Sequence, residues 1–176
     1  MISVKNGLNT LEKSAITADT KEGVDLTYEE LLEQADERGL IVKEKNLMAN
    51  AGRIKGNRIA IHRDMTSVEK SCILAEELGH HYTTIGDILD QDDSGNRKQE
   101  LRARLWAYNN QIGLRGIIRA YEAHLTELYE VAEFLEVTPE FLSETLQCYR
   151  SKYSPYTTID NYAIFFEPSL SVMKLI

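Results

Sequence analysis

The stretch Leu74-Ala-Glu-Glu-Leu-Gly-His-His-Tyr82 places four ionisable side chains in the most apolar helical segment of the chain. Glu76 and His80 are four residues apart, and so are Glu77 and His81, so each pair lies on one face of a helix. Adjacent carboxylates in a partly apolar setting raise each other's pKa unless a cation neutralises them. The stretch therefore predicts that one pair binds a divalent ion, while the other pair lies on the adjacent helix face and interacts with the bound ion.

The same stretch has the spacing of the metallopeptidase motif H-E-x-x-H, in which two histidines bind zinc and the intervening glutamate activates water. Glu77 and His80 occupy the positions of that glutamate and of the second histidine. Glu76 stands where the motif has its first histidine and still offers a ligand, although an anionic one. We predict Glu76 and His80 as metal ligands and Glu77 as the catalytic base.

Two alternative interpretations of these residues stay open. His81 replaces Glu76 as a ligand if the helix loosens near Gly79, because adjacent side chains on a regular helix point about 100° apart. In the second alternative, the four side chains form only two helix-surface pairs worth a few tenths of a kcal/mol each.

The sequence before the motif contains helix and strand signals. Thr66 and Glu69 have the spacing of a capping box, which predicts a helix over about residues 66–84. A second capping box predicts a helix over about residues 27–39. Residues 1–25 have no sustained periodicity and are expected to be a variable lead-in. Three β-rich segments predict a small antiparallel meander, at about residues 40–44, 53–55 and 57–62.

The sequence after the motif is mostly helical in pattern. An acidic loop precedes a helix predicted over about residues 97–109, and this helix ends a metallopeptidase-like core of residues 26–112. Residues 113–152 are predicted as a helical region and residues 153–176 as an extended aromatic tail. The expected fold class is α+β, with a small antiparallel sheet packed on a zincin-like motif helix and a mostly helical C-terminal half.

Composition restricts the classes of protein. A hydrophobic content of 43% fits a compact domain, and a formal charge of -8 disfavours a bulk nucleic-acid binder without excluding a local basic patch. No apolar run reaches the roughly 18 to 20 residues of a membrane span and no signal peptide is evident, so we expect a cytoplasmic protein without a membrane contact. Cys72 and Cys148 are expected to be reduced and structural.

These features together resemble the ImmA/IrrE family of metallopeptidases, bacterial and phage proteins that act on transcriptional repressors. That family has a third, glutamate ligand in the pattern Glu-x-x-Ala-x-x-aromatic-Ala, and this chain has Glu100-Leu-Arg-Ala-Arg-Leu-Trp-Ala107. The resemblance covers about residues 26–150 and implies Glu100 as the third ligand, with Zn²⁺ as the cofactor. The simpler alternative is that Glu100 pairs with Arg104, four residues on, and needs no metal.

The predicted ligand set has a consequence for the metal. Glu76, neutral His80 and Glu100 leave no net charge on a bound Zn²⁺, which weakens the activation of water, so that Mn²⁺ or another divalent ion can compete. The resemblance implies an endopeptidase that cleaves a helix-turn-helix repressor of a prophage or mobile element, without contacting nucleic acid itself. The alternative is a catalytically weak or inactive member that regulates a repressor by binding alone. A DNA-binding regulator acting through residues 126–150 is disfavoured, because the segment from Ala120 to Gln147 contains Glu but no Lys or Arg.

Overall fold

The computed structural model describes residues 26–48, 50–84 and 93–175, so the expected lead-in and most of the acidic loop lie outside the described residues. The first described helix, α2 (Tyr28–Glu37), begins at Thr27, whose side chain accepts a hydrogen bond from the Glu30 backbone N–H as the capping box predicts. Three strands follow: β1 (Ile41–Lys45), β2 (Gly52–Lys55) and β3 (Arg58–His62). The mixture of helices and small sheets confirms the α+β class.

The first sheet has the strand order β1-β3-β2, so β3 is central. Ile59 and Ile61 of β3 are almost fully buried on one face, whereas the edge strands β1 and β2 have no fully buried residue. β2 pairs antiparallel with β3, but β1 pairs parallel with it, so the predicted meander is wrong in its first strand. The central place of β3 follows from its two isoleucines, which make it the strand with most apolar area to bury.

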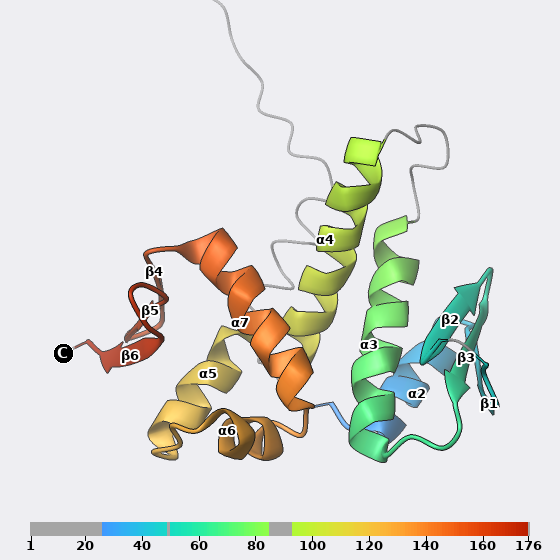
Figure 1. The fold of residues 1–176 in the computed structure, drawn as a ribbon, viewed down its shortest axis with the longest axis horizontal. Helices are drawn as coiled ribbons and strands as arrows, with labels where there is room; N and C mark the ends of the chain where they lie inside the picture. Colours follow the sequence, from blue (N-terminus) through green and yellow to red (C-terminus); the bar gives the residue numbers. More distant parts are fainter. Residues whose placement is uncertain (1–25, 49, 85–92, 176) are drawn as a thin grey trace, which may run out of the picture.

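The motif helix is α3 (Ser67–Thr84), and its predicted start at a capping box is confirmed. The Thr66 backbone N–H donates to the Glu69 carboxylate at 2.7 Å, and the Glu69 N–H donates back to the Thr66 hydroxyl at 3.2 Å. The next helix, α4 (Asp93–Gln111), runs beside α3 (Figure 1). A Cβ placed on Gly79 would lie 2.3 Å from the Ala103 carbonyl oxygen, so only glycine permits this close approach of the two helices.

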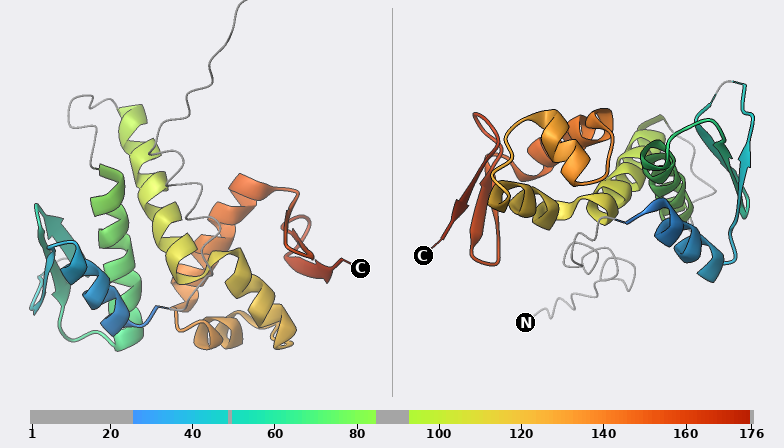
Figure 2. Two further views of the ribbon diagram at one scale, coloured as in Figure 1. Left: turned by 180° about the vertical axis from the view of Figure 1, so that it is seen from behind. Right: turned by 90° about the horizontal axis from the view of Figure 1, so that it is seen from below.

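The C-terminal half is helical, as predicted, and ends in a second sheet. The helices are α5 (Gly113–Glu122), α6 (Leu128–Phe134) and α7 (Pro139–Tyr153). The expected extended tail forms an antiparallel sheet of three strands in sequence order, β4 (Tyr156–Ile159), β5 (Tyr162–Phe165) and β6 (Ser171–Lys174). The two sheets lie at opposite ends of the molecule, with α3, α4 and α7 between them (Figures 1 and 2).

The two cysteines are free, as expected. Burial raises the pKa of the Cys72 thiol to about 11, so this side chain stays an uncharged part of the core. In the part of the chain that the structure describes, no helix combines the length and the apolar character needed to cross a membrane.

Candidate metal centre

His80 and Glu100 meet across the contact between α3 and α4. Gly79 and Ala103 bring the two backbones together, and the neighbouring His80 Nε2 then lies 3.6 Å from Glu100 Oε2. Two atoms that each lie about 2.0 to 2.2 Å from a tetrahedral zinc ion are about 3.4 Å apart. This pair therefore has close to the separation of two ligands of one ion.

Glu76 lies one helical turn before His80 and is half-buried. Its burial raises the pKa of the carboxyl to about 7; Arg104 opposes this rise, and the carboxylates of Glu144, Glu100 and Glu77 add to it. The protonated form of the Glu76 carboxyl therefore persists to a higher pH than in a solvent-exposed glutamate. A cation beside it would favour the charged form.

The Glu77 side chain extends from α3 toward the edge strand β2. Burial raises the pKa of its carboxyl, while His80 and a hydrogen bond from the Ile54 backbone N–H lower it. Gly52 of β2 packs so closely that a Cβ there would lie 2.4 Å from Ile73 Cγ2 and 3.0 Å from Glu77 Oε1. The predicted base is thus oriented by backbone atoms of the sheet, beside His80.

Arg104 supplies a positive charge within this group of carboxylates. Its Nε lies 2.9 Å from Glu100 Oε1 and its Nη1 lies 3.6 Å from Glu144 Oε2. The Tyr108 hydroxyl donates a hydrogen bond of 3.0 Å to the same Glu144 oxygen. The Glu100–Arg104 pair considered as an alternative is therefore present. Glu144 comes from α7, and sequence reasoning missed it because no local spacing links it to the motif helix.

The predicted ligands are assembled only in part. Within the described ranges, no three His, Cys, Asp or Glu side chains are arranged as a complete metal site. Two carboxylates and an imidazole nevertheless suit Zn²⁺ or Mn²⁺ by their chemistry, and His80 and Glu100 suit it by their separation. His81 instead makes an edge-on contact with the Tyr82 ring at 5.5 Å. Because α3 continues as an α-helix through Gly79, the loosening that His81 would need as a ligand is not seen.

Comparison with known proteins gives a family and a fold. Residues 20–147 match a peptidase family described as the IrrE N-terminal-like domain, which confirms the resemblance seen in the sequence. No curated protein matches the chain. Among solved structures, a Mycobacterium tuberculosis transcriptional regulator is similar, with a TM-score of 0.56 and 16% identity, over 81% of this chain and 48% of that chain. The chain thus spans about half the length of that regulator, and the identity supports a shared fold alone. Since the family match extends over most of the described chain, the motif helix and α4 included, the protein belongs to the IrrE N-terminal-like peptidase family.

Proposed function

We propose that the protein is a metal-dependent endopeptidase in which Glu76, His80 and Glu100 hold a divalent ion and Glu77 acts as general base. The observation that carries this proposal is the approach of His80 to Glu100, at 3.6 Å, across the contact of α3 with α4. The two residues are 20 positions apart in the sequence. They come together because the small residues Gly79 and Ala103 let α3 and α4 approach closely at the crossing.

The chemistry divides between the ion and the chain. Zn²⁺ or Mn²⁺, when bound, would polarise the scissile carbonyl and acidify a water molecule. Glu77 would take a proton from the attacking water and deliver it to the leaving amine, a role that suits a carboxyl whose pKa burial has raised. The Ile54 backbone N–H keeps this carboxylate oriented. Because Glu76 replaces a neutral ligand, we expect slower hydrolysis than at a site with two histidines.

The substrate we propose is a helix-turn-helix repressor of a prophage or mobile element, cleaved in the cytoplasm. Membership of the IrrE-like family supports this class of substrate. The similar solved structure is called a transcriptional regulator, which agrees with a role in gene control but names no substrate.

A second candidate is a family member that regulates a repressor by binding alone. The Arg104 side chain favours it, because its ion pair with Glu100 at 2.9 Å already neutralises a predicted ligand. The two candidates differ in whether the carboxylates bind a metal ion with useful affinity.

Metal content and cleavage together test the proposal. After preparation with excess Zn²⁺ or Mn²⁺, the wild type should retain close to one equivalent, and His80→Ala should lose most of it. Glu77→Gln should keep the metal and lose repressor cleavage by about 100-fold or more, since general acid–base catalysis contributes that much. Glu133→Gln, an exposed glutamate of α6, is the matched control and should change neither.

The outcomes separate the two candidates. Retention of less than about a tenth of an equivalent by the wild type would remove the physical basis of the peptidase. Metal binding without cleavage of the repressor, together with a cellular effect that Glu77→Gln leaves unchanged, would favour regulation by binding alone.

A further inference from the structure

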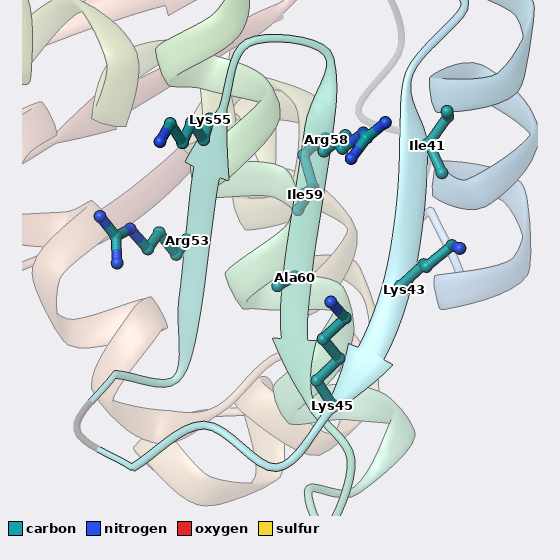
Figure 3. A pocket seen from close by; sticks show the side chains of 8 residues that line it. All are labelled: Ile41, Lys43, Lys45, Arg53, Lys55, Arg58, Ile59 and Ala60. Carbon is teal, nitrogen blue, oxygen red and sulfur yellow. The ribbon is translucent and has the colours of Figure 1, made fainter.

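The outer face of the first sheet carries a cluster of positive side chains, which we call the basic face. They line a hollow of about 400 Å³ together with apolar residues (Figure 3). All five basic residues are exposed, and they come from all three strands: Lys43, Lys45, Arg53, Lys55 and Arg58. The apolar residues that line the hollow are Ile41, Ile59 and Ala60.

Strand register explains how these side chains meet on one face. Lys43 and Arg53 are both opposite Ala60, one on each side of the central strand. In the next row, Ile41 and Lys55 flank Arg58 in the same way. Neighbouring strands are about 4.8 Å apart, so each row places its outer side chains within about 10 Å of each other. The result is a shallow apolar floor of Ala60 and Ile41 with cations around it.

The charges of the basic face are not balanced within the described part of the chain. None of the five side chains has a carboxylate oxygen within 4.0 Å there, although the whole protein carries a formal charge of -8. Lys55 lies directly opposite Arg58, an arrangement of like charges that destabilises a sheet. Lysines on edge strands do protect against edge-to-edge aggregation, but that reason does not extend to Arg58 on the central strand.

We propose that the basic face docks an acidic segment of a partner protein, with one apolar side chain of that segment seated on Ile41 and Ala60. The basic residues would pair with carboxylates on either side of the seated residue. Ile41 is 42% exposed, so it has apolar area to offer. The apolar floor favours a peptide over nucleic acid, because a charged phosphate backbone gains nothing from contact with apolar side chains. In addition, no aromatic ring lines the hollow for stacking with bases.

This docking surface is separate from the metal centre. The buried face of the same sheet, with Ile59 and Ile61, packs toward α3, whereas Lys43 and Arg53 point to the other side. A segment on the basic face would therefore leave Glu77 and His80 uncovered. The inference does not depend on whether the metal centre hydrolyses peptides.

Binding of a labelled acidic peptide to the full-length protein tests the proposal. The probe is a fluorescein-labelled peptide in which glutamates flank a single leucine, followed by anisotropy at low and at physiological salt. The wild type should bind it, more weakly at higher salt because the screening length shortens to about 8 Å. The double variant Lys43→Glu/Arg53→Glu should weaken binding by about tenfold or more. The control Lys98→Glu/Arg102→Glu makes the same charge change on exposed residues of α4 and should alter the affinity by less than about twofold.

Two further arms test the kind of partner. A peptide with glycine in place of leucine should bind more weakly to the wild type. The Ile41→Ser variant, which keeps the charge of the basic face, should bind the two peptides with equal affinity. A labelled duplex DNA should bind less tightly than the leucine peptide at the same salt. Tighter binding of the DNA, no binding of the peptide at low salt, or equal losses in the basic-face and α4 variants would each overturn the proposal. Thermal unfolding followed by circular dichroism establishes that each variant is folded.

Discussion

Individual charged side chains determine what the proposed metal centre could do. Glu76, at the position where the H-E-x-x-H motif has its first histidine, adds a half-buried carboxylate to a group that already contains Glu77, Glu100 and Glu144. Arg104 offsets part of that charge through its contacts with Glu100 and Glu144. A metal ion and the guanidinium would therefore compete for the same carboxylate of Glu100.

Replacing Arg104 with alanine should strengthen metal binding. The change frees Glu100 and removes a positive charge near the ion, so we expect the dissociation constant for Zn²⁺ to fall by about tenfold, equivalent to about 1.4 kcal/mol. Competition with a chromogenic chelator measures this. Arg102→Ala, on an exposed position of the same helix, should have little effect. Weaker binding by Arg104→Ala would indicate that the arginine positions Glu100 for the ion.

The pKa of Glu76 predicts how the stability of the metal-free protein depends on pH. The folded value of about 7 lies above the ordinary 4.5, so between these values the native state binds more protons than the unfolded state. The free energy of unfolding should therefore contain a component that is present at low pH and is lost as pH rises toward about 7. Urea unfolding at about pH 5 and about pH 8 measures it, and Glu76→Gln should remove it. Glu133→Gln, which changes an exposed carboxyl, should keep the wild-type pH dependence.

Pairs of elements decide whether the ligands meet, and the contact of α3 with α4 depends on small residues. Gly79→Ala should destabilise the fold by about 1 to 3 kcal/mol, because the new Cβ would lie 2.3 Å from a backbone carbonyl that cannot rotate away. Alanine's higher helix propensity, worth about 1 kcal/mol, offsets only part of this. Chemical denaturation and metal titration should show a loss of stability and weaker metal binding together. Gly116→Ala is the matched control, since its Cβ would meet only side chains, the nearest at 3.2 Å, and should cost less.

Lys55 and Arg58 form a like-charge pair that flanks the turn between β2 and β3. A binding role of the basic face would explain why the chain keeps this destabilising pair. Lys55→Glu places opposite charges across from each other, beside Arg58, and should stabilise the protein by up to about 1 kcal/mol. Thermal and urea unfolding measure the gain. Lys45→Glu makes the same charge change opposite His62 and should give a smaller gain in stability. If the basic face docks an acidic segment, Lys55→Glu should also weaken that binding, so that stability and affinity move in opposite directions.

For the whole molecule, metal binding at the proposed site between α3 and α4 should raise the free energy of global unfolding. The first sheet packs on α3 and the C-terminal helices pack on α4, so opening this contact means separating the two halves (Figure 2). A ligand at about 100 times its dissociation constant stabilises a fold by about 2.7 kcal/mol, which for a chain of this size corresponds to about 5 to 10 °C. Scanning calorimetry with and without Zn²⁺ should show this shift for the wild type, and a much smaller one for Glu100→Gln. An equal shift in both proteins would place the ion elsewhere.

The sequence by itself determined the helical framework and the family. The capping box of Thr66 and Glu69, the apolar spacing of α3 and the pattern beginning at Glu100 are all local, and local spacing is preserved in any fold that forms the helix. Ala103 and Ala107, the two alanines of that pattern, are both fully buried in the structure. These features were enough to indicate an IrrE-like peptidase fold, which the family match confirms.

Only the tertiary structure decided which distant residues become neighbours. It pairs β1 parallel with β3, folds the aromatic tail into a second sheet, and brings Glu144 to Arg104 and the Ile54 N–H to Glu77. It also gathers five cations of an acidic chain onto one face of a sheet. Strand partners and charge neighbours depend on contacts between segments far apart in the sequence, and the burial of Ile59 and Ile61, rather than any local spacing, selects among the possible arrangements.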